Sequence, residues 1–262
     1  MRRRGPWTTR RIIAGVGRRL PLRPIRIFFP FGLWRPLFRL WLATIRAQGN
    51  RRKAMRELLE VYADAYAGMD RGAISYGEGV HPKHRLTQYH DFFVERIRPG
   101  ERVLDVGCGK GELAYDVAER TGATVVGIDR AAWALTFARS QFAHPRVTYV
   151  ESDALTYEPD GPFDVAILSN VLEHVVERGE LLGSLRTRAH AQRILVRVPA
   201  IDRDWTVPLR RELGLPFFSD PEHEVEFTEE LLREELRKAG WESGEPTFAW
   251  GEIWVVAVAK SA

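Results

Sequence analysis

Short apolar runs alternate with amphipathic stretches along most of the chain after residue 100. Apolar runs that end at glycine or at an acid predict buried strands, and apolar positions repeating every three or four residues predict helices between them. Strands are expected at 103–106, 124–128, 147–150, 163–168, 191–198, near 247 and at 253–259, and helices up to 120 and at 131–142, 178–189 and 228–239. This order predicts an α/β fold: helices cover both faces of a mainly parallel sheet, and a closing hairpin adds one antiparallel strand.

Two stretches interrupt this alternation. A helix is expected over 51–67, then a glycine-rich segment at 72–85 and a helix over 86–97, so residues 51–98 are predicted to form a helical cap or lid. A long loop is expected over 199–226, after the fifth strand. With the N-terminal arm, these features give three predicted segments, namely 1–50, 51–98 and 99–262.

The stretch Val103–Leu113, VLDVGCGKGEL, joins the first strand to its helix through glycines at alternate positions. Because glycine has no Cβ, the backbone bends sharply there and a ligand can approach closely. The spacing D-x-G-x-G-x-G begins with Asp105 at the strand end and differs from the G-x-G-x-x-G of a dinucleotide site. The loop is therefore predicted to contact a ligand.

Polar residues follow the carboxyl ends of the next three strands. Asp129, at the end of the second strand, is placed to accept both hydroxyls of a ribose, and Asp153, after the third, can accept from an adenine amino group. Ser169–His174 follow the fourth strand. In an open α/β sheet such groups converge on one crevice, so a ligand site is predicted there.

Charge is distributed unevenly along the chain. Residues 1–53 contain 15 of the 39 lysines and arginines and no acid, which leaves 24 basic and 35 acidic residues in the remainder. An acidic body is poorly suited to gripping a phosphate backbone, whereas a basic apolar arm suits an anionic membrane surface.

The arm contains one candidate membrane-binding helix. Within 25–46 no charge-free run reaches the roughly 20 residues that span a bilayer. On a helical wheel Arg35, Arg39 and Arg46 lie on one face, opposite the apolar residues Trp34, Leu37, Phe38, Trp41 and Ile45. This layout predicts peripheral membrane contact through residues 25–46, and the alternative is a helix that packs on its own protein. A mitochondrial transit peptide is also Arg-rich, but the first serine is Ser75, and no apolar region of a secretory signal follows the first arginines.

Cysteine and histidine usage predicts a reducing compartment and no metal. Cys108 is the single cysteine, so no intrachain disulfide forms and a cytoplasmic location is expected, peripheral to the inner membrane face if the arm binds lipid. Cys108 has no evident histidine or acid partner and is interpreted as a small loop residue. His81 and His84 are three residues apart, but Pro82 disfavours a helix there and no cysteine cluster accompanies them, so no metal site is predicted.

These features together resemble the class I S-adenosylmethionine-dependent methyltransferase family over about 103–260. The resemblance implies a Rossmann-like, seven-stranded, mostly parallel sheet whose last strand is antiparallel, with an N-terminal helical extension here. It implies that the glycine loop holds the methionine part of S-adenosylmethionine, that Asp129 binds the ribose and that Asp153 binds the adenine. The expected cofactor-binding residues are Asp105, Gly107, Cys108, Gly109, Gly111, Asp129, Arg130, Asp153, Ala154, Ser169 and Asn170.

The segment SNVLEHV, 169–175, looks like the motif after the fourth strand of small-molecule methyltransferases. It lacks the Asn-Pro-Pro-Tyr signature of enzymes acting on nucleobase amino groups, so no nucleic-acid partner is expected. The segments 79–93, 197–205 and 219–232 look like bacterial enzymes of cell-surface polysaccharide and lipopolysaccharide biosynthesis. The narrower resemblance implies a small-molecule or lipid-linked sugar acceptor and O-methylation.

Removing a hydroxyl proton requires a base, and histidine is suited to that task. His174 and His223 are the leading candidates, and Asp220, Glu224 and His84 follow; His174 alternatively only shapes the pocket floor. Trp205, Phe217 and Phe218 are candidates for stacking on a sugar or prenyl chain, or for anchoring the loop. Arg197 and Arg203 are candidates for binding an acidic sugar or diphosphate.

Two other readings of function stay open. One is a methyltransferase acting on a quinone, a lipid or another small metabolite. The other is a non-catalytic, cofactor-binding accessory protein of a glycan-assembly complex. The acids Asp105, Asp129 and Asp153 are all present, which disfavours a degenerate site.

Overall fold

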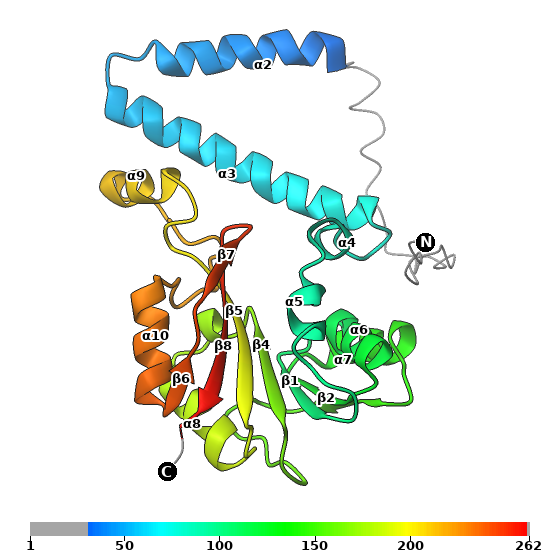
Figure 1. Cartoon of the computed structure of the whole chain (residues 1–262). Helices are drawn as coiled ribbons and strands as arrows, with labels where there is room; N and C mark the ends of the chain where they lie inside the picture. The colour runs from blue at the N-terminus through cyan, green and yellow to red at the C-terminus, as the bar shows by residue number, and fades with distance from the viewer. Residues whose placement is uncertain (1–30, 261–262) are drawn as a thin grey trace. The chain divides into compact units, whose positions relative to one another are not determined.

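The computed structural model describes residues 31–260, and the chain divides after Pro82 into two compact units (Figure 1). Residues 1–30 of the predicted arm lie outside the described range, as do residues 261–262. The predicted cap, 51–98, is shared between the two units.

The first unit consists of helices α2 (Phe31–Arg46) and α3 (Arg51–Tyr76). The Asn50 side chain caps α3 by accepting a hydrogen bond from the Lys53 amide at 3.0 Å, as capping asparagines do. The Gln48 amide donates to the Glu57 carboxylate at 2.7 Å and ties the connecting turn to α3. Within the described range, no helix is both long and apolar enough to span a membrane.

Helix α3 is longer than predicted. The expected end before Gly68 was wrong, because a glycine inside a helix costs only about 1 kcal/mol relative to alanine and does not by itself end it. The helix ends instead at Gly77, where a Cβ would lie 1.9 Å from the Val80 carbonyl oxygen. Only glycine permits the chain to turn back so closely at this point.

The second unit is built on an eight-stranded sheet with the order β3-β2-β1-β4-β5-β8-β6, and β7 also pairs with β8. Strands β1 to β5 are parallel, and β8 runs antiparallel to β5. The predicted Rossmann-like sheet is confirmed. The strands are β1 (Arg102–Val106), β2 (Thr124–Asp129), β3 (Val147–Glu151), β4 (Val165–Ser169), β5 (Arg193–Pro199), β6 (Trp241–Ser243), β7 (Thr247–Ala249) and β8 (Glu252–Ala259).

The predicted strand count of seven omitted β6. This strand is three residues long, too short to show an alternating pattern, and it is held by the fully buried Trp241, whose indole N–H donates to the Leu182 carbonyl at 2.9 Å. Seven strands form the continuous path, and β7 is the eighth.

Alternate residues of each central strand point into two separate cores. Leu104, Ala166 and Val196 pack with leucines of α8 and α10, whereas Val103, Val165 and Leu195 pack with α6 and α7. Figure 1 shows these helix pairs on opposite sides of the sheet. The helices of this unit are α4 (Lys83–Thr87), α5 (His90–Val94), α6 (Glu112–Thr121), α7 (Ala132–Gln141), η1 (Leu172–His174), α8 (Arg178–Thr187), α9 (Thr206–Leu213) and α10 (Glu229–Lys238).

Two helical predictions need correction. The helix expected over 86–97 is divided into α4 and α5, because Gln88 has a φ of 52° and a left-handed residue cannot continue an α-helix. The loop expected over 199–226 contains α9, whose Pro208 lies in the first turn, where proline is tolerated.

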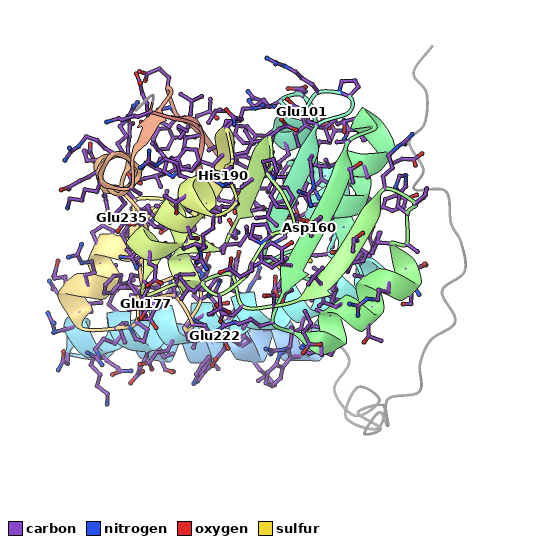
Figure 2. All side chains as sticks on the ribbon, turned by 90° about the horizontal axis from the view of Figure 1, so that it is seen from below. Glu101, Asp160, Glu177, His190, Glu222 and Glu235 are labelled. Atoms are coloured by element: carbon purple, nitrogen blue, oxygen red, sulfur yellow. The ribbon has the colours of Figure 1, made fainter. Side chains whose placement is uncertain are left out.

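The carboxyl ends of the parallel strands lie at one edge of the second unit. In Figure 2, Glu101, which precedes β1, is labelled far across the view from Glu177 and Glu222, which follow β4 and β5 along the chain. Ligands in open α/β sheets bind at the carboxyl edge, so this is where a site is sought.

Candidate functional site

The glycine loop between β1 and α6 has the backbone shape that its sequence requires. Gly107, Gly109 and Gly111 all have positive φ, at 65°, 53° and 84°. Gly111 is also confined by its neighbours: a Cβ there would lie 2.5 Å from the Tyr149 hydroxyl oxygen and 2.9 Å from the Ala138 Cβ. Glycine at this position lets α6 begin directly against β3 and α7.

Asp129 holds the loop from the end of β2. Its Oδ2 accepts a hydrogen bond from the Gly109 amide and its Oδ1 accepts one from the Ala131 amide, both at 2.8 Å. The Cys108 amide donates to the Ile128 carbonyl at 3.0 Å. The acid predicted to bind a ribose therefore also fixes the shape of the loop.

Asp105 lies beneath the loop and is 2% exposed. Burial raises its pKa to about 8, and the negative charges of Asp129 and Glu112 add to the shift. Its Oδ2 has no hydrogen-bond partner. A buried carboxylate oxygen without a partner is costly, so this atom is suited to accept from a cationic ligand group such as the amino group of a methionine moiety.

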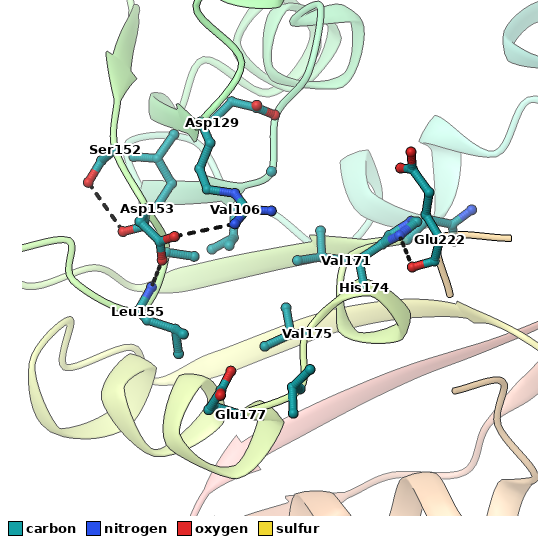
Figure 3. A pocket seen from close by; sticks show the side chains of 16 residues that line it. Val106, Asp129, Ser152, Asp153, Leu155, Val171, His174, Val175, Glu177 and Glu222 are labelled. Atoms are coloured by element: carbon teal, nitrogen blue, oxygen red, sulfur yellow. Dashed lines mark hydrogen bonds and ion pairs between the residues drawn. The ribbon is translucent and has the colours of Figure 1, made fainter. Parts of the chain in front are cut away.

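A pocket of about 630 Å³ opens at the carboxyl ends of β1, β2, β3 and β4, within the size range of ligand sites. Figure 3 shows Asp129 and Asp153 on one side of it and His174 and Glu222 on the other. Asp153 accepts from the Leu155 amide at 2.8 Å and lies 3.5 Å from the Arg130 guanidinium. The predicted cofactor residues that line the pocket are Gly107, Asp129, Arg130, Asp153, Ala154 and Asn170.

The other predicted cofactor residues do not line the pocket, namely Asp105, Cys108, Gly109, Gly111 and Ser169. Cys108 is buried, its sulfur lies against Gly127, and burial raises its thiol pKa. These observations agree with its interpretation as a small loop residue. Ser169 accepts from Arg197 at 3.3 Å. Asn170, with a φ of 57°, donates to Glu252 at 3.1 Å.

The two predicted catalytic histidines are in contact, and His174 lines one end of the pocket, whereas His223 lies behind it and is not a lining residue. The rings of His174, from η1, and His223, from the loop after α9, are 4.7 Å apart at nearly a right angle. The loop is held to η1 by the Glu224 amide, which donates to the Glu173 carbonyl at 2.7 Å. Nδ1 of His174 also lies 3.3 Å from the backbone carbonyl oxygen of Glu222. Segments about 50 residues apart in sequence thus form one site.

Glu226 is the buried group that organises the His223 loop. It accepts hydrogen bonds from His223 Nδ1 at 3.1 Å and from the Ser219 hydroxyl at 2.6 Å, and it pairs with Arg203. Burial opposes its ionisation, but the hydrogen bonds from His223 and Ser219 outweigh burial and lower its pKa. Glu226 therefore stays ionised and fixes the His223 ring.

Glu173, next to His174, is fully buried, and neither of its carboxylate oxygens has a hydrogen-bond partner. Burial raises its pKa to about 7. Within the part of the chain that the structure describes, Glu173, His174 and His223 form the group of acidic and histidine side chains with ligand spacing. No role was predicted for Glu173 from the sequence.

The structure places the predicted substrate residues away from the pocket lining. His84 contacts Tyr89 and His90, each at 3.0 Å. Trp205 is 70% exposed at the start of α9. Asp220 accepts from the Glu222 amide at 2.8 Å, and Glu224 contributes its backbone amide to the contact with η1. The pocket residues missing from the predicted set are mostly apolar and lack a chemical signature, namely Val106, Ile128, Leu155, Val171, Val175 and Val176, with Ser152, Glu177 and Glu222.

Both candidate arginines serve the fold. Arg197 is 5% exposed, forms a bidentate ion pair with Glu252 at 2.5 and 2.6 Å, and lies over the ring of Tyr89 at 4.1 Å. Arg203 pairs with Glu226 and donates to the Phe217 carbonyl at 2.8 Å. Both guanidinium groups are thus engaged by protein partners, which does not favour their suggested role in binding an acidic sugar or diphosphate.

Comparison with known proteins gives a family and a fold. The sequence profile of the family described as a methyltransferase domain matches residues 78–243. Ribosomal protein L11 methyltransferase of Burkholderia lata is 39% identical over 104 residues, covering 38% of this chain and 32% of that protein. The chain thus spans about a third of the length of the curated relatives it matches.

Solved structures share the fold at low identity. One is from the complex between the Haloferax volcanii Trm112 methyltransferase activator and the putative methyltransferase, with a TM-score of 0.57 and 15% identity over 76% of this chain and 96% of that chain. Magnesium protoporphyrin IX methyltransferase from Synechocystis PCC 6803, solved with bound SAH, aligns with a TM-score of 0.50 and 17% identity over 91% and 99%.

The glycine loop, the strand-end acids and the pocket agree with the family that the profile identifies. Asp129 and Asp153 line the pocket, and the pocket volume suits a nucleoside cofactor. Since the profile covers more than half of the chain, this chain belongs to the methyltransferase-domain family, and its cofactor is S-adenosylmethionine.

Proposed function

We propose that this protein transfers the methyl group of S-adenosylmethionine to a hydroxyl of a small-molecule or lipid-linked sugar acceptor. The observation that supports this reaction is the contact between His223 and His174, which lines the end of the pocket opposite Asp129 and Asp153. Methylation of a hydroxyl requires loss of its proton, and a histidine pair is suited to activate such a group.

In this proposal, residues at the two ends of the pocket have different roles. S-adenosylmethionine supplies a methyl group that is already activated on a sulfonium. Asp105, Asp129 and Asp153 would hold its amino, ribose and adenine groups. His174 and His223 would activate the acceptor oxygen, and Glu226 orients His223 through the 3.1 Å hydrogen bond. Catalysis would then rest mainly on alignment of the two substrates.

Replacing His223 with alanine is expected to lower methyl transfer by about 100-fold or more, the range of a lost acid–base group, with little change in S-adenosylhomocysteine affinity. His190→Asn is the matched control, because His190 is exposed and belongs neither to the pocket lining nor to the group of Glu173, His174 and His223. Purified protein, methyl-labelled cofactor and fractionated cell extract would measure transfer, and calorimetry would measure affinity.

The destination of the label tests the acceptor class. Label in a sugar or lipid fraction, lost in His223→Ala, supports the proposal. Label in a protein fraction would contradict the proposal, and it would point to a protein acceptor like the one named for the Burkholderia relative, ribosomal protein L11. Label in an RNA fraction would also contradict the proposal. Normal cofactor binding with no label in any fraction would favour the accessory reading.

We also propose that α2 binds the surface of an anionic membrane, which would bring the enzyme to a lipid-linked acceptor. Trp34, Leu37 and Trp41 are 53%, 53% and 46% exposed, and Arg35 and Arg39 are exposed beside them. Ile45 of the predicted apolar face is instead buried. Exposed aromatic residues beside arginines are typical of interfacial helices.

Replacing Trp34 and Trp41 together with serine is expected to weaken binding to anionic vesicles at least about tenfold, because the two exposed rings that would enter the lipid interface are lost. The control is Trp133→Ser, since Trp133 is 69% exposed but belongs to α7. Vesicle sedimentation at low and high salt would measure binding. Equal losses in the two variants would argue against an α2 membrane surface.

A further inference from the structure

We propose that Glu173, His174 and His223 bind a divalent transition metal ion of the class that includes Zn²⁺ and Co²⁺. One potential ligand atom from each residue lies within 4.8 Å of the other two. Two imidazoles and one carboxylate are a donor set typical of such ions, and they leave coordination positions open.

The Glu173 carboxylate is the first argument for a ligand. Its side chain is fully buried, and both oxygens lack a hydrogen-bond partner. The nearby amides of Glu224 and Val225 donate to the Glu173 backbone carbonyl and not to its carboxylate. An unpartnered buried carboxylate is costly, and a cation would remove that cost.

The second argument is the environment of the histidines. Nδ1 of His223 contacts the Glu226 carboxylate at 3.1 Å, and Nδ1 of His174 contacts the Glu222 carbonyl at 3.3 Å. Both partners are acceptors, so each Nδ1 donates its N–H, and in this tautomer of the neutral ring Nε2 has the lone pair that a metal ion requires. Metal-binding histidines commonly donate their second ring nitrogen to a carboxylate or a backbone carbonyl in this way.

The three potential ligand atoms must move slightly closer together to bind one ion. Ligands around a tetrahedral ion with bonds of about 2.1 Å are roughly 3.4 Å apart, which is less than the separation found here. His174 is exposed on η1, so its ring has room to move, whereas Glu173 and His223 are held by burial and by Glu226. The ion would therefore be held mainly by Glu173 and His223 and completed by His174.

The position of the ion suggests its role, and this step rests on the proposed function. His174 lines the pocket, so an open coordination position would be available to the acceptor. A metal-bound hydroxyl has a lowered pKa, and its proton would leave to solvent. The histidines would then activate the acceptor as ligands of the ion. The metal-binding step itself does not depend on this role.

The test uses the full chain without an affinity tag, after treatment with a chelator and in the absence of cofactor. Co²⁺ is titrated into this protein, and binding is measured by calorimetry and by visible absorption. One ion per chain with visible d–d bands is expected, and Zn²⁺ should displace it. Glu173→Gln and His223→Ala should each weaken binding by about 100-fold or more, beyond the 10- to 100-fold typical of losing an outer partner. His190→Asn should bind as the unmodified protein does.

Two further measurements distinguish loss of the metal site from loss of the fold or of cofactor binding. Circular dichroism and S-adenosylhomocysteine binding of Glu173→Gln should match the unmodified protein, because glutamine keeps the shape of the buried side chain. Any of three results would overturn the inference. They are the absence of a stoichiometric Co²⁺ site, a Co²⁺ affinity of Glu173→Gln equal to that of the unmodified protein, and tighter binding of Mg²⁺ than of Co²⁺. In those cases methyl transfer could still be found, whereas a metal site without transfer would contradict only the proposed function.

Discussion

Gly111→Ala is expected to destabilise the protein by about 2–5 kcal/mol, combining left-handed strain of 1–2 kcal/mol with overpacking of 1–3 kcal/mol. Gly111 has a φ of 84°, and the added Cβ would lie 2.5 Å from the Tyr149 hydroxyl oxygen. That hydroxyl donates to the Phe142 carbonyl at 2.9 Å, so the ring is not free to withdraw. Chemical denaturation followed by circular dichroism would measure the loss.

Gly109→Ala is the matched control for this variant. Gly109 lies two residues earlier in the same loop with a φ of 53°, but a Cβ there has nothing within 4 Å. Only the backbone strain of about 1–2 kcal/mol should remain. Equal destabilisation by the two substitutions would show that contact with Tyr149 and Ala138 does not constrain the loop.

Asp129→Ala is expected to weaken S-adenosylhomocysteine binding by about 100-fold, or roughly 3 kcal/mol. The substitution removes an acid from the pocket wall, and it also leaves the amides of Gly109 and Ala131 without their acceptor. The loop would lose its fixed shape together with a direct ligand contact. Calorimetric titration would give the dissociation constant.

Two further variants serve as controls for the loss of affinity expected in Asp129→Ala. Glu151 ends β3 beside Asp129 in the sheet, yet it is exposed and outside the pocket lining, so Glu151→Ala should bind the ligand normally. Asp129→Asn keeps one acceptor oxygen and should give an intermediate affinity. An unchanged dissociation constant in Asp129→Ala would remove Asp129 from the cofactor site.

Most of the sheet could be predicted because its residues alternate between two cores. Strands β1 and β4 contain short apolar runs, and β1 is followed by glycine while β4 ends at a serine, a pattern that is local in sequence. The end of α3 and strand β6 could not be predicted in this way. The first depends on how closely Gly77 approaches Val80, and the second depends on burial of Trp241 against α8.

The side of the pocket formed by strand-end acids was predictable for a related reason. The carboxyl ends of parallel strands must lie along one edge, so Asp129 and Asp153 were expected together, and both line the pocket. The surroundings of the two histidines were only partly predictable. His223 lies on a long loop, and nothing in its sequence indicates that Glu226 and Arg203 fold this loop onto η1.

The sequence by itself determined the α/β class, the glycine loop and the acids at the strand ends, because periodicity and strand order follow from short-range patterns. Only the tertiary structure decided that Arg197 and Arg203 have carboxylate partners, and that the carboxylate oxygens of Glu173 have no hydrogen-bond partner. Pairing and burial depend on residues distant along the chain. For that reason the contacts around His174 and His223 came from the fold and not from the motif.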